Sequence, residues 1–376
     1  MADKKHKKRV ELRKNRFKRP REQNWGRVFE EQGEDVFAGE ERVRAKGDIS
    51  RKRTIIADTA AEAMPTVDQS ACLPGRVLRV MGLLCDVETD DGRLVRCAVR
   101  RLLKTLATDE RNIVTTGDRV WIHLAKSGEG VIERVESRHG LLIRSSKGRE
   151  HVLVANVDQV VIVMALAEPD LKPHLIDRYL VSAEQGGLRP IVCLNKADLV
   201  DSALVQPLIG YYRQLGIVTL PTSAATGLGL DRLKRLLRGR ESVFTGQSGV
   251  GKSSLLNAVQ PGLGLAVRSV SDTTQKGRHT TTTAQLLRLD FGGWVVDTPG
   301  LRQFQLWDIL PEELEGFFPD FRPFVHRCVY PDCTHTHEDR CAVKDAVALR
   351  YISDRRYVSY LGMFEGRMEE MKDDYT

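Results

Sequence analysis

A glycine-rich loop limits the possible folds of this chain more than any other feature. Residues 246–253 read GQSGVGKS, which matches the phosphate-binding pattern GxxxxGK[ST]. The short run Ser242–Thr245 precedes the loop and has strand character, and Ser254–Val259 follows it with helical character. This strand, loop and helix order predicts an α/β domain in which a parallel strand leads into a phosphate-binding helix N-terminus.

The residue types of this loop indicate how it would hold a nucleotide. Its glycines let backbone N–H groups converge on phosphate at a helix N-terminus. Lys252 would neutralise the β and γ phosphates, and the Ser253 hydroxyl would ligate magnesium. The predicted phosphate-binding set is Gly246, Gln247, Ser248, Gly249, Val250, Gly251, Lys252, Ser253 and Ser254.

A second motif, Asn195-Lys196-Ala197-Asp198, comes before this loop, whereas ordinary GTPases carry it afterwards. It ends the apolar run 190–194, and a second apolar run spans 158–165, with helical spacing between them at 173–185. Near-continuous apolar runs of this length are typical of parallel strands buried on both faces. The order of the two motifs therefore indicates a nucleotide site whose parts are rearranged along the chain.

The second motif has the chemistry to select guanine. The Asp198 carboxylate could accept both N1–H and N2–H of the base, a donor pair that adenine lacks. Asn195 would brace neighbouring loops, and the aliphatic stem of Lys196 would cover the base. The backbone of Ser223 and Ala224 could bind guanine O6. The four-residue string could equally be a plain helix start capped by Asp198.

The expected switch segments lie downstream of the phosphate loop. A predicted strand at 293–297 ends in Asp297, which suits the second magnesium sphere, usually through water. The N–H of Gly300 could sense the γ phosphate. Residues 276–283 are polar and rich in hydroxyls, and Thr281 is the preferred magnesium ligand among four consecutive threonines. The alternative for 276–283 is an ordinary Ser/Thr-rich surface loop.

Residue 301 is a leucine, where many small GTPases place the glutamine that orients the attacking water. An aliphatic side chain cannot align water. His279 is the best available substitute, because a neutral imidazole can accept a hydrogen bond from water. A structural histidine is the alternative. We therefore predict His279, Lys252 and Gly300 as the catalytic group, with slow hydrolysis that a partner accelerates.

The beginning of the chain is strongly basic. Residues 1–21 contain eleven Lys or Arg against two acids, with few apolar side chains to bury. We expect residues 1–70 to form a disordered extension and linker, with one short helix around 59–63. The basic segment would be an RNA-binding arm, or else a solubilising tail.

The segment 71–140 has short alternating runs separated by turn residues. Five such runs in about seventy residues favour a small antiparallel barrel of the OB type, whose open face often binds RNA. A barrel that only packs against its neighbour is the alternative. Six basic residues favour nucleic acid weakly: Arg76, Arg79, Arg96, Arg100, Arg101 and Lys104.

A cysteine and histidine group near the C-terminus predicts a structural metal site. Cys328, Cys333, His335 and Cys341 would close a tetrahedral zinc shell with no open position for catalysis. His326 and His337 compete for the imidazole role. The patterns at 345–351 and 353–367 predict helices around this site, with four arginines available for phosphate: Arg350, Arg355, Arg356 and Arg367.

The order of these motifs over residues 72–365 resembles the RsgA (YjeQ) family of circularly permuted GTPases, which act in maturation of the bacterial small ribosomal subunit. The resemblance implies a multidomain protein with a β-barrel (OB-fold), a central α/β P-loop GTPase domain with circular permutation, and a mostly α zinc-binding domain. It also supports His279 as the catalytic histidine and the Cys, Cys, His, Cys group as zinc ligands. The expected domains are 1–70, 71–140, 150–308 and 309–376. The basic extension of about seventy residues departs from the family pattern.

The resemblance implies a cytoplasmic, monomeric GTP hydrolase with one structural Zn²⁺ and with Mg²⁺ bound alongside GTP. Its partners would be the 30S subunit and 16S rRNA, with no membrane, and its nucleotide state would control release. Two alternatives remain open: an rRNA-binding assembly protein in which GTP binding is mainly structural, and an adenine-using P-loop ATPase. The chain has no apolar run of membrane-spanning length and no N-terminal signal-peptide pattern.

Overall fold

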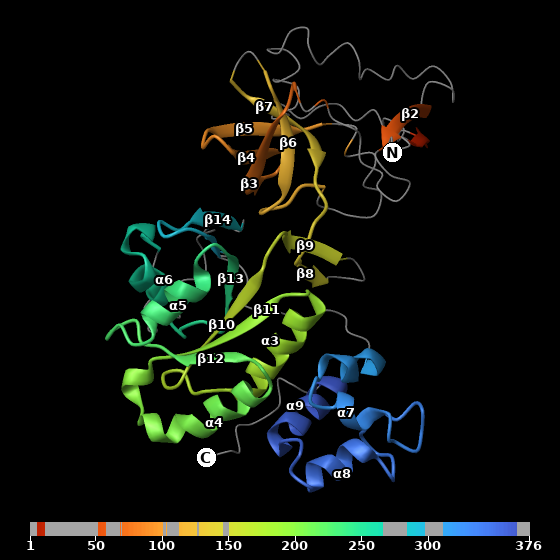
Figure 1. Ribbon diagram of the computed structural model, residues 1–376, viewed down its shortest axis with the longest axis vertical. Coiled ribbons are helices and arrows are strands. Elements are labelled where there is room, and N and C mark those ends of the chain that lie inside the picture. Colours follow the sequence, from red (N-terminus) through yellow and green to blue (C-terminus); the bar gives the residue numbers. More distant parts are fainter. Residues whose placement is uncertain are drawn as a thin grey trace, which may run out of the picture. The chain divides into compact units, whose positions relative to one another are not determined.

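A computed structural model describes residues 6–11, 52–57, 68, 70–100, 103, 113–125, 128–145, 150–265, 284–297 and 311–366. The chain divides into two compact units, Met1–Arg138 and His139–Thr376 (Figure 1). Among the described helices, none combines the length and apolar character needed to cross a lipid bilayer. The helix expected at 59–63 lies outside the described residues.

The first unit contains the predicted barrel. Its strands run in the order β3–β4–β5–β7–β6, and β6 pairs with β3 to close the ring. The pairs are antiparallel except β5 and β7, which are parallel. This is the five-stranded Greek-key barrel expected from the alternating runs. The strands are β3 (Leu73–Met81), β4 (Leu84–Thr89), β5 (Leu94–Val99), β6 (Arg119–Leu124) and β7 (Gly130–Val135).

Side chains at alternate positions of the strands fill the barrel interior, as the alternating sequence pattern predicts. Val77, Cys85, Val87, Ile122 and Ile132 are fully buried there.

The N-terminal extension contains a pair of strands that we did not expect. β1 (His6–Glu11) and β2 (Lys52–Ala57) are antiparallel, with His6 opposite Ala57. These segments have strand propensity despite their charge, because they contain the β-branched residues Val10, Thr54, Ile55 and Ile56. The structure therefore differs here from an extension without fixed structure.

The second unit is built on a six-stranded sheet in the order β12–β11–β10–β13–β15–β14. All neighbours in this order are parallel except β14 and β15, which are antiparallel. A separate antiparallel ladder joins β8 (Leu142–Ser145) to β9 (Glu150–Val154). The sheet strands are β10 (Gln159–Ala165), β11 (Arg189–Asn195), β12 (Val218–Pro221), β13 (Glu241–Thr245), β14 (Gln285–Arg288) and β15 (Trp294–Asp297).

This strand order makes the circular permutation visible. The strand before the phosphate loop, β13, lies in the middle of the sheet between β10 and β15. β10, β11 and β12 precede it along the chain but occupy one side of it in space.

Helices cover the two faces of this sheet. α3 packs on β10 and β11, while α5 packs on α6 through shared leucines in one core. Pro173 is the first residue of α3, a position that favours the start of a helix. Asp201 caps α4, because its side chain accepts a hydrogen bond from the Ala203 N–H at 2.9 Å. The helices are α3 (Pro173–Gln185), the 3₁₀ turn η2 (Ala197–Leu199), α4 (Ser202–Gln214), α5 (Leu230–Leu237), α6 (Lys252–Val259) and the 3₁₀ turn η3 (Pro261–Leu263).

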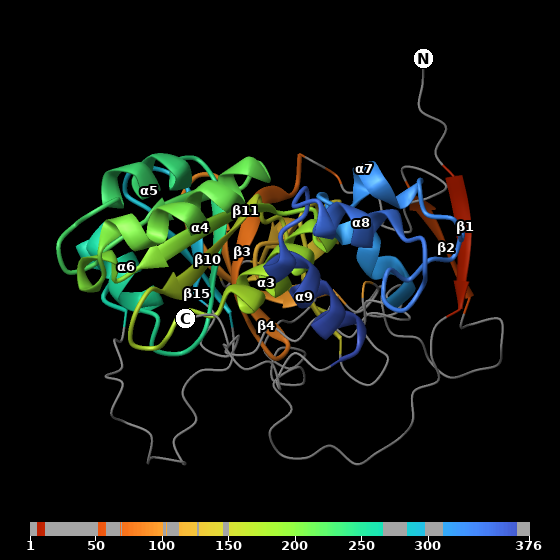
Figure 2. The same cartoon turned by 90° about the horizontal axis from the view of Figure 1, so that it is seen from below.

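The C-terminal part of this unit is helical, as predicted, and lies beside α3 (Figure 2). Phe318, Phe321 and Tyr360 form its aromatic core, which Val181 of α3 joins. The predicted helix 345–351 is displaced, because Arg350 adopts φ 64° and ends it earlier. The elements are η4 (Pro311–Phe317), α7 (Arg322–Val325), α8 (Ala342–Ala348) and α9 (Asp354–Phe364).

Candidate nucleotide and metal sites

The predicted phosphate and guanine motifs meet at the carboxyl edge of the parallel sheet. Ala165 of β10 lies opposite Asn195 of β11, and Leu194 of β11 lies opposite Pro221 of β12. β13 ends at Thr245 beside the same edge, immediately before the phosphate loop. This edge is where ligands bind in open α/β sheets.

Two glycines of the phosphate loop hold positions that no other residue could occupy. Gly246 has φ 139°, and a Cβ there would lie 2.0 Å from the Val163 carbonyl oxygen. Gly251 has φ 90°, and its Cβ would lie 2.5 Å from Nδ2 of Asn195. The loop backbone therefore depends on the absence of side chains at both positions.

The ammonium group of Lys252 lies over the phosphate loop. Its Nζ donates to the carbonyl oxygens of Gly246 at 2.7 Å and Gln247 at 2.6 Å. Lys252 is the first residue of α6 and Ser253 the second, so both follow the loop at a helix N-terminus. That position combines a positive side chain with the favourable end of the helix dipole for an anion.

The side chain of Asn195 connects the guanine motif to the phosphate loop. Its Nδ2 donates to the Val250 carbonyl oxygen at 2.8 Å, and Thr222 Oγ1 donates to its Oδ1 at 3.3 Å. Asn195 is 2% exposed. The bracing role expected for Asn195 thus has a definite geometry, and Thr222 is a contributor that the motif alone did not reveal.

A cavity of about 430 Å³ opens beside these residues. It brings together the predicted guanine-reading residues and the start of α6, and it adds Leu199 and Ala225, which we did not predict. Lys196 has φ 59°, and its Nζ donates to the Glu168 carbonyl oxygen. The cavity is lined by Asn195, Lys196, Asp198, Leu199, Ser223, Ala224, Ala225, Gly251 and Ser254.

Several predicted site residues lie outside the described residues. These are His279, Thr281, Gly300 and Leu301, together with Arg367. Asp297 is the last residue of β15, where its backbone pairs with Gln285, and only its backbone is described.

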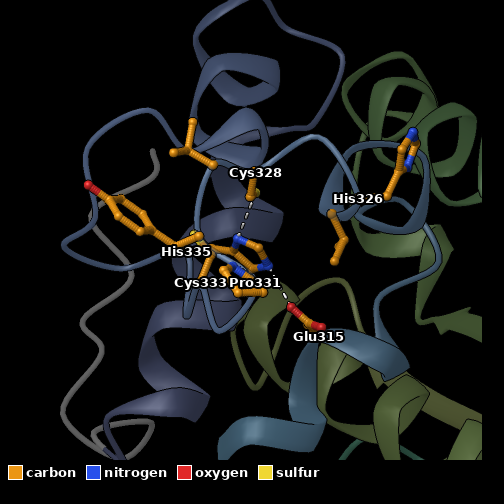
Figure 3. A pocket seen from close by; sticks show the side chains of 9 residues that line it. Glu315, His326, Cys328, Pro331, Cys333 and His335 are labelled. Atoms are coloured by element: carbon orange, nitrogen blue, oxygen red, sulfur yellow. Dashed lines mark hydrogen bonds and ion pairs between the residues drawn. The ribbon is translucent and has the colours of Figure 1, made fainter.

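The cysteine and histidine group forms a compact cluster with the dimensions of a metal site (Figure 3). Its four ligand atoms all lie within 4.8 Å of one another. Cys328 Sγ is 3.9 Å from Cys341 Sγ and 3.6 Å from His335 Nδ1, which is itself 3.3 Å from Cys341 Sγ. Tetrahedral bonds to zinc place ligand atoms about 3.5–3.8 Å apart. The spacing of these ligand atoms therefore matches a tetrahedral cation of this size, bound by Cys328, Cys333, His335 and Cys341.

A carboxylate orients the histidine of this cluster. Glu315 Oε2 lies 2.6 Å from His335 Nε2, on the side of the ring away from the cysteines (Figure 3). A proton on Nε2 leaves Nδ1 free to donate its lone pair to a cation. Glu315 lies twenty residues before His335 in the sequence, and no motif spacing pointed to it.

The competing histidines do not join the ligand cluster. His326 lines a cavity of about 350 Å³ next to the cluster, and the side chain of His337 is 83% exposed. Burial raises the pKa of the Cys333 thiol to about 12, a cost that a bound cation would offset by favouring the thiolate.

Hydrogen bonds order the loop around the cluster. Tyr357 and Tyr360 donate to the carbonyl oxygens of His335 at 2.7 Å and Thr334 at 2.8 Å. Burial alone would raise the pKa of Glu338, but hydrogen bonds from Thr334 and its neighbours outweigh burial and hold it at about 2. The loop therefore keeps its shape through the protein's own contacts.

One predicted phosphate ligand in this region is wrong. Arg356 is 1% exposed and contacts two aspartates, so it cannot reach solvent phosphate. Arg350 is exposed but pairs with Asp354.

Comparison with known proteins relates most of this chain to one family. The RsgA GTPase family profile matches residues 135–307. The small ribosomal subunit biogenesis GTPase RsgA of Bacteroides fragilis is 37% identical over 303 residues, covering 79% of this chain and 98% of that protein. The protein of the same name from Thermotoga petrophila is 45% identical over 254 residues, covering 67% and 83%.

Two solved structures share the fold. The crystal structure of YjeQ from Thermotoga maritima has a TM-score of 0.66 and 38% identity, covering 79% of this chain and 99% of that one. YloQ, a circularly permuted GTPase, has a TM-score of 0.63 and 27% identity, covering 82% and 99%.

Proposed function

Because this chain belongs to the RsgA family of circularly permuted GTPases, we propose that it hydrolyses GTP on the small ribosomal subunit and assists late maturation of that particle. Relatives that it covers almost completely carry the name small ribosomal subunit biogenesis GTPase. In this proposal, the nucleotide state controls release. The single observation that supports nucleotide binding most strongly is the 2.8 Å bond between Asn195 and Val250, which joins the guanine motif to the phosphate loop.

In this proposal, guanine occupies the cavity of about 430 Å³. Asp198 accepts the two N–H groups of the base, and the stem of Lys196 covers one face. The backbone N–H of Ala224 is assigned to O6, whereas the N–H of Ser223 donates to the Leu228 carbonyl oxygen at 3.0 Å and would have to leave it to reach the base. Residues 246–254 hold the phosphates, with Lys252 moving its ammonium group from loop carbonyls to phosphate oxygens.

We assign Ser253, Thr281 and Asp297 to the magnesium ion that accompanies GTP. The positions of Ser253, second in α6, and Asp297, at the end of β15, fit this role, because both elements end or begin at the same sheet edge. When bound, magnesium would neutralise charge on the β and γ phosphates. The assignment of Thr281 rests on its place in the hydroxyl-rich segment 276–283, between the phosphate loop and Asp297.

For hydrolysis, we assign His279 to orient the attacking water, since Leu301 cannot accept a hydrogen bond. A neutral imidazole accepts a hydrogen bond from that water and aligns it with the γ phosphate. Lys252 and the N–H of Gly300 stabilise the charge that develops on the phosphate oxygens. The small subunit would accelerate this step by holding His279 in place.

We assign zinc to the Cys328, Cys333, His335 and Cys341 cluster, because three thiolates and one imidazole in tetrahedral geometry suit that ion. All four positions are occupied by protein, so the ion would be structural. We assign domains at 1–70, 71–140, 150–308 and 309–376, and we expect a cytoplasmic monomer that contacts 16S rRNA.

The competing proposal is an rRNA-binding assembly protein in which GTP is mainly structural. Phosphate release should be measured with and without purified 30S particles, for the natural chain and for His279→Ala. Stimulation by 30S that His279→Ala abolishes would support the enzyme, and its absence would favour the alternative. A melting temperature raised by GDP but not by ADP would exclude an adenine-using site.

A further inference from the structure

A cluster of exposed arginines on α5 and on the residues that follow it has no ion-pair partner among the described residues. Residues 230–240 contain five basic side chains and one exposed acid, Asp231. We call Arg232, Arg235, Arg238 and Arg240 the α5 basic face. All four are exposed, and no ion pair joins them to any carboxylate of the described residues.

The amphipathic pattern of α5 fixes the direction of this face. Leu233 and Leu237 are fully buried in the core that they share with Leu255 and Leu256 of α6. Arg232 and Arg235 lie on α5 away from these leucines, and Arg238 and Arg240 continue the exposed basic segment beyond the last helical residue, Leu237.

Several other arginines of the described residues are neutralised by nearby carboxylates. In the barrel, Arg138 makes two 2.8 Å contacts with Asp118, and Arg100 pairs with Glu133. In the C-terminal part, Arg356 is buried with two aspartates. The α5 basic face thus differs from these sites in having both exposure and unbalanced charge.

Stabilisation of the helix dipole explains only part of this cluster. Basic residues in the last turn of a helix interact favourably with its C-terminal carbonyls. That effect applies to Lys234 and Arg235. Arg238 and Arg240 come after the last helical residue, where the dipole requires no further charge. A solvated cluster of this kind also accumulates repulsion, which an anionic ligand would relieve.

The composition of the face selects among anionic partners. No large exposed hydrophobic side chain of the described residues falls within 230–240, so the face offers neither a base-stacking platform nor an apolar protein-docking patch. Clustered guanidinium groups match repeated phosphates, each of which can accept two hydrogen bonds from one arginine. This favours a folded nucleic-acid backbone over unstacked bases.

We propose that the α5 basic face binds the phosphate backbone of folded RNA, specifically 16S rRNA of the small subunit. This proposal rests on the proposed function, which supplies an RNA-containing partner. The shared leucine core joins α5 to α6, the helix that begins at Lys252. RNA bound to α5 would therefore act, through this shared core, on the helix that follows the phosphate loop.

The test uses the full-length chain with arginines 232, 235 and 238 replaced together by glutamine. Binding to protein-free 16S rRNA and to intact 30S particles is measured across a salt series. We expect at least tenfold weaker binding to both near 0.15 M salt, and a salt slope smaller by about 2–3, because roughly one counterion is released per phosphate contact.

Two control variants separate charge from shape and position. The triple Arg→Lys variant at 232, 235 and 238 keeps the charge and should bind within about threefold of the natural chain. The triple variant Arg93→Gln, Arg189→Gln and Arg322→Gln removes equal charge from exposed positions elsewhere and should do the same. Melting temperature and basal GTP hydrolysis should be unchanged in all three, since none of these side chains lines the nucleotide cavity.

Unchanged rRNA binding by the triple glutamine variant would overturn the proposal. Weaker binding to 30S with unchanged binding to protein-free rRNA would also overturn it, because the face would then contact an acidic protein. If the natural chain neither binds 30S nor is stimulated by it, the proposed function itself fails. That result is independent of the α5 variants.

Discussion

The guanidinium of Arg356 in α9 donates to the Asp177 carboxylate of α3 at 2.8 Å, in an ion pair that solvent does not reach. Asp320 accepts from the same guanidinium at 3.3 Å, and the Phe318 ring lies 4.2 Å from it. Tyr212 of α4 donates to Asp177 at 3.1 Å. This buried polar cluster therefore connects α3 and α4, the two helices that flank the guanine motif, to the metal-binding region.

Replacing Arg356 with methionine should destabilise the protein strongly. Two carboxylates would remain buried without their cation, which typically costs about 3–5 kcal/mol. The double variant Arg356→Met and Asp177→Leu should recover part of this loss, and urea unfolding of the natural chain, both single variants and the double variant measures the coupling. Purely additive losses would contradict a direct energetic link.

The same substitution should make stability depend on pH. Burial raises the pKa of Asp177, and Arg356 opposes that rise by favouring the carboxylate. Without Arg356, the folded-state pKa rises further above the unfolded value, so the folded chain binds the proton more tightly. The stability of Arg356→Met should therefore fall as pH rises from about 4 toward the folded-state pKa. The natural chain, unfolded in urea over the same pH range, is the reference, and parallel curves would refute the assignment.

Gly251→Ala should abolish tight nucleotide binding. Its Cβ would lie 2.5 Å from Asn195 Nδ2 at a φ of 90°, so the bond from Asn195 to Val250 could not survive. We expect GDP affinity to fall at least a hundredfold, a loss of about 2.7 kcal/mol, as measured by titration calorimetry. Gly262→Ala, where a Cβ meets nothing within 4 Å, is the matched control and should bind normally.

Asp198→Asn should change base preference rather than destroy the site. Xanthine carries a carbonyl where guanine carries its 2-amino group, so an asparagine amide can donate where aspartate could only accept. We expect GDP binding to weaken by two or more orders of magnitude and xanthosine diphosphate to bind better than GDP. Equal weakening for both nucleotides would mean that Asp198 does not contact the base.

Glu315→Gln should weaken metal retention without removing a ligand. The carboxylate holds His335 Nε2 at 2.6 Å, and loss of such a partner typically reduces metal affinity 10–100-fold. Competition with a coloured zinc chelator measures the change. Glu313→Gln, on the same 3₁₀ turn but exposed, should retain zinc like the natural chain. If the two variants release zinc alike, Glu315 does not orient His335.

Local patterns allowed the sites to be predicted because their chemistry is carried by short segments. The Asn195 and Lys252 motifs, and the cysteine spacing around His335, each lie within one loop and its flanking element. Contacts between distant segments left no such pattern. Glu315 reaches His335 from another element, and Asp177 meets Arg356 across 179 residues.

The prediction that Arg356 is available for phosphate was wrong, and the residue spacing in α9 shows why. Arg356 shares a buried face with Tyr360 and Met363, spaced four and three residues apart. That spacing marks an inward-facing position, and the charge alone concealed it. The α5 arginines have the opposite arrangement, because Leu233 and Leu237 occupy the inward positions.

Phosphate release under single-turnover conditions, with and without 30S particles, tests the account most directly. The natural chain should hydrolyse GTP slowly alone and at least tenfold faster with 30S, and His279→Ala should lose that stimulation while binding GDP normally. Stimulation that persists in His279→Ala, or no stimulation of the natural chain, would contradict a subunit-activated GTPase that uses this histidine.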